Sequence, residues 1–272
     1  MRFLMLKTRL GITLILMLCT ALIFSLILSE VVSQSTCSSV ADRCRPLLGG
    51  LRITIRVPLI IGYDDRMCSL GFPVYVIVNN QQVYGVLTCA HCVTARYQAG
   101  VESIYQPTIA SENYIGFASR LGNYTDSAFI PTSNFGVNVS YRVFWCEYPY
   151  YLDVAGSYPK EFKPGSSTEV HLIAATSGCM SGYPYAIDSS NDPPWIIKFR
   201  IEARGGDSGG VLIEKGGDRA IAIGIVVGVV YSCQGGSCLF LYSIAHHIGY
   251  IIEDLGVNLY LWDGGGGDRV GP

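Results

Sequence analysis

Residues 204–210 read Arg-Gly-Gly-Asp-Ser-Gly-Gly, a loop of small residues around the hydroxyl of Ser208. Taken alone, glycine beside Asp and Ser is also typical of an ordinary turn. A serine hydroxyl is a good nucleophile only where a base takes its proton and donors hold the oxyanion that forms. The loop therefore has chemical meaning only if the chain also supplies a base and an acid that orients it.

Both groups precede the loop. The histidine stands in Leu87-Thr88-Cys89-Ala90-His91-Cys92, and the acid stands in Asp126-Ser127-Ala128-Phe129-Ile130. The order His, Asp, Ser and the residues around each member resemble the chymotrypsin-like (trypsin-like) serine peptidases. The stretches Arg66–Phe72 and Leu255–Tyr260 are most similar to the streptogrisin and alpha-lytic bacterial branch, and the resemblance covers roughly Ile55 to Tyr260.

The resemblance implies a role for each residue. His91 would take the proton of Ser208 as Oγ attacks a carbonyl, and Asp126 would hold the imidazole in the required tautomer. The backbone N–H groups of Gly206 and Ser208 would form the oxyanion hole. We therefore expect a serine endopeptidase that cleaves protein or peptide substrates through an acyl-enzyme intermediate, without a cofactor. The alternatives are a catalytically impaired member of the same fold that binds peptides, and a structural β-domain.

Two positions depart from the family pattern. Val227 stands where the family has a serine whose hydroxyl supports the catalytic aspartate, and Leu172 stands where the bacterial branch has an arginine that pairs with Asp207. A buried carboxylate without a partner is costly. We therefore expect Asp207 to find another cation, and a new N-terminal amine released by cleavage after Arg52 or Arg56 is one hypothesis.

Substrate preference is expected from the strand that follows the nucleophile. By resemblance, Val226–Val230 is an edge strand that pairs with the substrate backbone, and Val227, Gly228 and Val229 bind substrate. Val229 would narrow a pocket that glycines leave open in the family, which favours small or medium apolar side chains. Glu202 would instead select Lys or Arg if it lay at the pocket base, although the bacterial branch has a bridge cysteine there.

Composition indicates one large domain and an N-terminal segment. The chain has 272 residues, a net charge of -2 and 15% charged residues, so it lacks the basic patch that nucleic acid binding requires. Leu10–Leu28 carries no charge and follows Arg2, Lys7 and Arg9, as in a signal peptide or a membrane anchor. We expect this segment at 1–30, a linker or pro-segment at 31–54, the peptidase domain at 55–262 and a flexible tail at 263–272. We expect the protein to be a monomer and to be secreted or anchored at the cell surface.

An oxidising location makes the ten cysteines candidates for disulfides. The resemblance implies Cys68 with Cys92. Cys37 with Cys44 and Cys233 with Cys238 are close enough in sequence to close small loops, and Cys146 with Cys179 remains. Cys19 lies in the apolar segment, and Cys89 is expected as a free, buried thiol.

Cys89, His91 and Cys92 also have the spacing of half a zinc site. His246 and His247 are distant candidates for the remaining ligands, but they are expected as packing or surface residues of a C-terminal helix. No second Cys-x-x-Cys pair follows, and a zinc ligand at His91 would remove the base. We therefore expect no metal.

Short β-branched and aromatic runs separated by turn residues predict an all-β fold. They lie at Phe72–Val78, Gln82–Thr88, Val143–Cys146, Glu169–Ala174, Trp195–Ile201, Gly210–Ile213 and Ile221–Val230. Ile244–Leu255 is the one segment with a helical pattern. The resemblance implies two antiparallel six-stranded β-barrels with the site in the cleft between them.

Overall fold

The computed structural model describes residues 37–94, 102–185 and 192–264. The compact unit that contains them begins at Cys37. The apolar segment Leu10–Leu28 and residues 265–272 of the expected tail lie outside the described residues. Within the described ranges, no helix combines the length and the apolar character needed to cross a bilayer.

The first half of the domain consists of short strands and turns. Its elements are β1 (Leu47–Gly49), β2 (Arg52–Pro58), β3 (Tyr63–Ser69), β4 (Pro73–Val78), β5 (Gln81–Thr88), α2 (Ala90–Val93), β6 (Ser103–Tyr105), η1 (Ser111–Asn113), β7 (Tyr114–Gly116), β8 (Arg120–Leu121), β9 (Ala128–Ile130) and η2 (Thr132–Phe135).

Longer strands form the second half, which ends in a helix. Its elements are β10 (Val139–Phe144), β11 (Tyr151–Ser157), β12 (Val170–Ala174), β13 (Gly178–Gly182), β14 (Ile196–Phe199), β15 (Val211–Gly216), β16 (Arg219–Gln234), β17 (Ser237–His247), α3 (Ile248–Leu255) and β18 (Asn258–Leu259).

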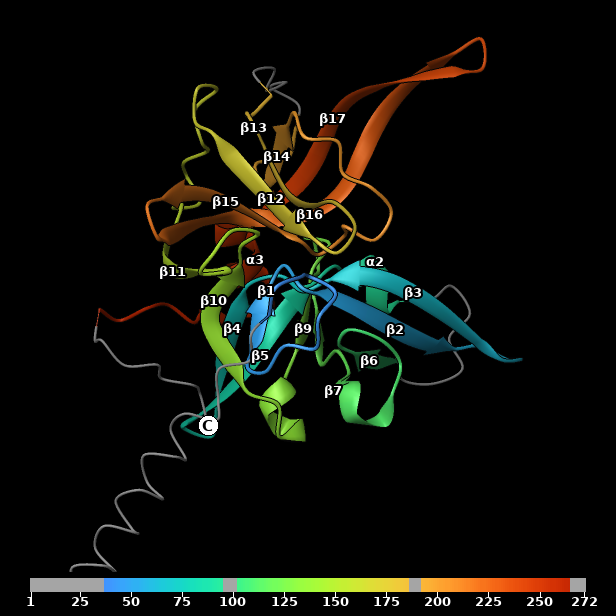
Figure 1. The fold of residues 1–272 in the computed structure, drawn as a ribbon, viewed down its shortest axis with the longest axis vertical. Coiled ribbons are helices and arrows are strands. Elements are labelled where there is room, and N and C mark those ends of the chain that lie inside the picture. The colour runs from blue at the N-terminus through green and yellow to red at the C-terminus, as the bar shows by residue number, and fades with distance from the viewer. Residues whose placement is uncertain (1–36, 95–101, 186–191, 265–272) are drawn as a thin grey trace, which may run out of the picture. The chain divides into compact units, whose positions relative to one another are not determined.

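The strands pair as three sheets (Figure 1). One sheet has the order β18-β4-β5-β9-β8, and a second has the order β3-β2-β6-β7. The largest follows the path β1-β10-β11-β16-β15-β12-β13, with β17 beside β16 and β14 beside β17. The prediction of a mostly β chain is confirmed. The pairings among the described residues do not close these sheets into the two six-stranded barrels that the resemblance implies.

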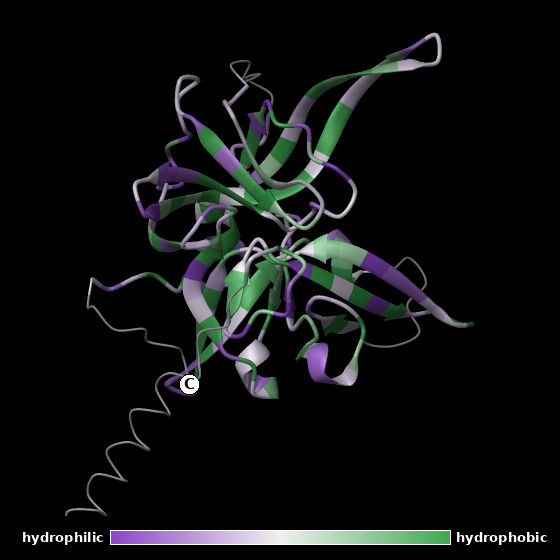
Figure 2. Ribbon diagram, in the orientation of Figure 1, coloured by the Kyte–Doolittle hydropathy of each residue, from purple (hydrophilic) through white to green (hydrophobic). Residues whose placement is uncertain are grey.

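Alternating side chains explain why the first half forms strands. Along β2, Ile53, Ile55 and Val57 are fully buried, whereas the residues between them are partly exposed. Figure 2 shows this change between apolar and polar residues along β2. The turn between β4 and β5 falls at Asn79 and Asn80, whose φ angles of 50° and 61° are left-handed and are tolerated by asparagine.

The expected domain boundary at Ile55 is wrong. Leu47 and Leu51 are fully buried in the core, β1 pairs with β10, and β2 begins at Arg52. Residues 37–54 are therefore part of the domain rather than a linker, because their apolar side chains complete its core.

The expected helix at Ile244–Leu255 is correct only for its second part. Ile244–His247 continue β17, where Ile244 pairs with Gly228 in β16 and His246 pairs with Ile196 in β14. The strand conformation is favoured here because this part of β17 pairs with β16 on one side and with β14 on the other. The helix α3 starts after His247, whose Nδ1 accepts the N–H of Gly249, and ends at Leu255, where Gly256 caps it with a φ of 61°.

Candidate active site

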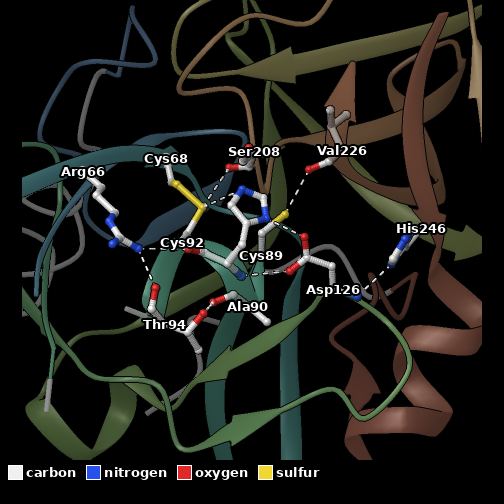
Figure 3. A network of polar contacts seen from close by, with 11 residues as sticks. Arg66, Cys68, Cys89, Ala90, Cys92, Thr94, Asp126, Ser208, Val226 and His246 are labelled. Atoms are coloured by element: carbon white, nitrogen blue, oxygen red, sulfur yellow. Dashed lines mark hydrogen bonds and ion pairs between the residues drawn. A yellow bond between two sulfur atoms is a disulfide. The ribbon is translucent and has the colours of Figure 1, made fainter. Parts of the chain in front are cut away.

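His91 lies in α2, the short helix that follows β5, and two links hold this helix. The disulfide Cys68–Cys92 joins the helix to β3. The guanidinium of Arg66 donates from Nη1 to the carbonyls of His91 and Thr94, at 3.1 and 2.5 Å. Figure 3 shows both links beside the site. The backbone that carries the histidine is therefore fixed from β3.

Asp126 bonds His91 twice. Its Oδ1 accepts the backbone N–H of His91 at 2.9 Å, and its Oδ2 is bonded to Nδ1 of the ring. Burial alone would raise the pKa of the Asp126 carboxyl, but the bonds from His91 and its charge outweigh burial and hold that pKa below its usual value. The carboxylate is thus ionised at neutral pH, and it favours the imidazole tautomer that carries a proton on Nδ1.

Ser208 is half-buried in the loop before β15. Its carbonyl accepts the N–H of Ser69 at 2.8 Å, which ties the loop to β3. Figure 3 shows Ser208 and Asp126 on either side of the imidazole bonded to Asp126. Within the described ranges, Oγ of Ser208 has no hydrogen bond to the imidazole of His91. The bond between a nucleophile and its base is often long before substrate binds.

The loop before Ser208 leaves two amides free. Within the part of the chain that the structure describes, the N–H groups of Gly206 and Ser208 have no acceptor. Gly206 has a φ of +98°, and a Cβ there would lie 2.5 Å from Cε of Met67 and from Oγ1 of Thr176, so glycine is required. The hydroxyl of Ser69 donates to the carbonyl of Gly206 at 2.9 Å and fixes that peptide's orientation. The two amides are thus available to hold an oxyanion.

Asp207 has a complete set of hydrogen bonds, and no cation among the described residues pairs with it. The carboxylate is fully buried. Its Oδ1 accepts the N–H groups of Thr176 and Ser177 at 3.0 and 2.9 Å, and its Oδ2 accepts the Ser177 hydroxyl at 2.5 Å and the Arg204 N–H at 2.7 Å. The expectation of another cation is therefore wrong, because backbone amides and one hydroxyl stabilise the charge instead.

The hypothesis of a new N-terminal amine after Arg52 or Arg56 is contradicted as well. Both arginines lie in β2, which pairs with β3 on one side and with β6 on the other. Releasing an amine there would pull the buried Ile53 or Val57 out of the core. Leu172, at the position of the family's arginine, is fully buried in β12.

His246 is a site residue that the sequence interpretation missed. It is buried in β17, and its Nδ1 accepts the backbone N–H of Asp126 at 2.8 Å (Figure 3). Burial lowers the pKa of its imidazole, although the charge of Asp126 opposes this effect. The ring is therefore neutral at pH 7, with its proton on Nε2. His246 was expected on a helix, and only the strand pairing of β17 brings it to Asp126.

Two residues near the site were singled out from the sequence, Val227 and Cys89. Val227 is partly buried against the core and supplies no hydroxyl. The thiol of Cys89 is fully buried and donates to the carbonyl of Val226 at 3.1 Å. Candidate ligand atoms of Cys89, His91 and Asp126 lie within 4.8 Å of one another. Burial, followed by the charge of Asp126, raises the pKa of the Cys89 thiol well above its usual value, so the thiolate that zinc requires is disfavoured.

The structure contains the remaining expected disulfides and the expected free thiol. Among the cysteines that the structure describes, the bonded pairs besides Cys68–Cys92 are Cys37–Cys44, Cys146–Cys179 and Cys233–Cys238, and the free thiol is that of Cys89. The Nε2 of His247 donates to the carbonyl of Phe162 at 2.8 Å and its Nδ1 accepts the N–H of Gly249, so both ring nitrogens are bonded outside the site. His246 and His247, the distant candidates for zinc ligands, therefore bond different groups, namely the backbone of Asp126 and the carbonyl of Phe162.

The strand expected to bind substrate lies beside the nucleophile loop. The N–H of Val226 donates to the carbonyl of Gly210, and the N–H of Gly209 donates to the carbonyl of Val226, at 2.9 and 2.8 Å. Val227, Gly228 and Val229 follow on β16 and are each partly exposed. Glu202 is exposed, and its Oε1 accepts the hydroxyl of Tyr231 at 2.9 Å. This bond directs the Glu202 carboxylate toward β16.

Comparisons with known proteins bear on the fold. No protein-family model and no curated protein sequence matches the chain. A glutamic acid-specific serine protease, whose description gives it a histidine triad in substrate binding, superposes with a TM-score of 0.51 at 17% identity, covering 79% of this chain and 100% of its own. This chain has the fold of a serine protease. The predicted resemblance to the chymotrypsin-like peptidases is thus confirmed at the level of fold.

Two further structures of serine-protease fold are similar at lower scores. The chymotrypsin of Cellulomonas bogoriensis has a TM-score of 0.49 at 24% identity, covering 79% of this chain and 98% of its own. The Nocardiopsis protease has a TM-score of 0.47 at 18% identity, covering 78% of this chain and 97% of its own.

Proposed function

We propose that the protein is a serine endopeptidase in which Ser208 is the nucleophile, His91 the general base and Asp126 the orienting acid. The observation that carries this proposal is the pair of bonds from Asp126 to His91, beside a loop with two free amides. In this arrangement Oγ of Ser208 attacks a peptide carbonyl as Nε2 of His91 takes its proton. The amides of Gly206 and Ser208 stabilise the oxyanion, and His91 returns the proton to the leaving amine. The acyl group left on Oγ is then hydrolysed by a water whose proton His91 takes and passes back to Ser208.

No step of this reaction needs a metal or a cofactor, and the substrates are proteins or peptides. Val229 on β16 narrows the pocket beside Ser208, which favours small or medium apolar side chains before the cleaved bond. The fold of a serine protease supports two six-stranded barrels as the underlying architecture. The four disulfides support action in an oxidising compartment, as a monomer that is secreted or held at the membrane by Leu10–Leu28.

Covalent labelling with a fluorophosphonate tests the proposal. The folded protein is expected to react at Ser208 and to cleave casein, and Ser208→Ala is expected to lose both activities. Ser166→Ala, a change at an exposed serine between β11 and β12, is the matched control and is expected to retain both. A folded wild-type protein that does not label would contradict the enzyme assignment.

The absence of a hydroxyl at Val227 favours a second candidate, a catalytically impaired peptide-binding member of the fold. A protein of this kind would bind casein-derived peptides without reacting with the probe. The same labelling experiment, combined with peptide binding measured by calorimetry, separates the two functions.

A further inference from the structure

The strands β16 and β17 extend beyond the sheet that carries them. β15 pairs with β16 only as far as Ile225, and β14 pairs with β17 only from Ser243 onward. We call the remaining two-stranded part, residues 227–234 and 237–242, the arm. Figure 1 shows β16 and β17 leaving the rest of the domain together. Along the arm, no strand of the described part of the chain pairs with the outer edge of β16.

The turn at the tip decides which backbone groups face this open edge. Gly235 and Gly236, with φ angles of 58° and 84°, form a two-residue turn, and Gln234 pairs with Ser237. The residues that flank such a turn bond each other, and the bonding side alternates along an antiparallel strand. The N–H and C=O groups of Cys233 and Tyr231 therefore point away from β17. The register shifts between Val230 and Tyr231, but the extra residue, Leu241, lies on β17, so the alternation along β16 continues and the groups of Val229 point outward as well.

Three observations mark the edge as a binding surface. Residues 227–242 include no Asp, Glu, Lys, Arg or Pro, the residues that natural proteins place on exposed edges to prevent pairing. Tyr231 and Leu239 are 41% and 70% exposed. The disulfide Cys233–Cys238 closes the tip, and the Tyr231 hydroxyl bonds Glu202, so the arm is held in shape before it meets a partner.

The edge continues directly from the proposed site. Val226 bonds Gly209 and Gly210, the two residues after Ser208, so β16 passes beside the nucleophile at Val227. The register between β16 and β17 shifts between Val226 and Gly228, so Val227 is an extra residue on β16 and the alternation changes phase there. A substrate strand lying antiparallel to β16 would place the first residue before the cleaved bond opposite Val227. Its third, fifth and seventh residues would then lie opposite Val229, Tyr231 and Cys233, because bonding positions recur every second residue.

We propose that the arm is an extended substrate-binding edge, which adds backbone pairing at the fifth and seventh residues before the cleaved bond. This inference rests on the proposed peptidase function and names its substrate class, namely polypeptides with at least seven residues in an extended conformation before the cleavage point. Cys233 lies four residues, or about 13 Å, beyond Val229 along the strand. The arm thus selects unfolded or loosely structured chains over short peptides.

Peptides of graded length test the proposal. The casein site that the protein cleaves fastest is synthesised with two, four, six or eight residues before the cleaved bond and a constant sequence after it. The value of kcat/KM is expected to rise at least tenfold between four and eight residues. A rise that ends at four residues in the wild-type protein overturns the proposal.

Two backbone variants locate the effect. Tyr231→Pro removes the outward N–H at the fifth position, and Tyr231→Val removes the same side chain but keeps that N–H. Tyr231→Pro is expected to lose most of the gain beyond four residues, whereas Tyr231→Val retains it. Replacing residues 233–238 by Asn-Gly shortens the arm behind the bonded pair Ser232 and Leu239. With this variant, kcat/KM is expected to level off at about six residues or fewer.

Other outcomes remain distinguishable. Fluorophosphonate labelling and hydrolysis of a short acylated ester are expected to be equal in all variants, and equal values show that each variant is folded. A wild-type protein that does not label refutes the proposed function instead. A length effect that Tyr231→Pro retains overturns the proposal. The proposal is also overturned if the wild-type protein forms a concentration-dependent dimer or binds neutral phosphatidylcholine vesicles, and the shortened arm abolishes that association without changing the length effect.

Discussion

The backbone N–H of Asp126 donates to Nδ1 of the buried His246, 2.8 Å away, so the residue whose carboxylate orients His91 is itself bonded by a second histidine. Val227 supplies no hydroxyl to Asp126, and His246 restrains the same residue through its backbone. Replacing His246 with phenylalanine leaves that N–H without an acceptor, which costs roughly 1–3 kcal/mol where the group is buried. We expect kcat to fall about tenfold with KM unchanged. His246→Asn offers an acceptor oxygen near the position of Nδ1, and it should restore most of kcat if His246 acts through this bond.

Acid sensitivity follows from the same histidine and its neighbour. Burial lowers the pKa of His246 and of His247 below the usual value of 6.5. Below pH 6.5 the unfolded chain therefore binds more protons than the folded one, so folding stability is complete above that pH and declines as the pH falls toward the folded pKa values. Urea denaturation between pH 7.5 and 5 should show this decline. His246→Asn should make it shallower, and an unchanged pH profile would contradict this account.

Gly206 is expected to be irreplaceable and Gly205 replaceable. A Cβ at Gly206 would lie 2.5 Å from two side-chain atoms, and the backbone φ of +98° there disfavours any residue with a side chain. A Cβ at Gly205 meets no atom within 4 Å. Gly206→Ala should displace one oxyanion donor and reduce kcat by about 100-fold to 1000-fold. Gly205→Ala should stay within about threefold of the wild type. Equal rates for the two variants in an ester assay would argue against an oxyanion hole at this loop.

Activity is expected without cleavage near the N-terminus of the domain. The Asp207 carboxylate is satisfied by backbone amides and the Ser177 hydroxyl, so no new amine is required. Mass spectrometry of the labelled protein should find Arg52–Val57 intact. Ser177→Ala removes a hydrogen bond to a buried charge and should lower the free energy of unfolding by roughly 1.5–3 kcal/mol. The exposed Ser181→Ala, on the adjoining strand β13, should change it by less than about 0.5 kcal/mol.

Cys89 is expected to be chemically inert in the folded protein. Its thiol is fully buried, its pKa is raised by burial, and it donates to the carbonyl of Val226. Iodoacetamide should modify Cys89 only after denaturation, and dialysis against EDTA should leave fluorophosphonate labelling unchanged. Loss of labelling on dialysis, with recovery on adding zinc, would favour the metal site instead.

Local sequence was sufficient to predict the elements that depend on local chemistry. The strands alternate or concentrate β-branched residues, and the turn at Asn79-Asn80 has the residues that a left-handed backbone favours. The motifs around His91, Asp126 and Ser208 were recognisable because each role needs a particular residue type among particular neighbours. The short cysteine loops were predictable because few residues separate the partners.

Only the tertiary structure decided which distant groups meet. Nothing near Asp207 in the sequence indicates that Ser177 would replace a cation, and nothing near His246 indicates that β17 would bring it to Asp126. The open edge of β16 likewise depends on where β15 and β14 stop pairing. A sequence specifies each residue's own conformational and chemical preferences, whereas hydrogen bonds between distant segments exist only once the sheets have packed.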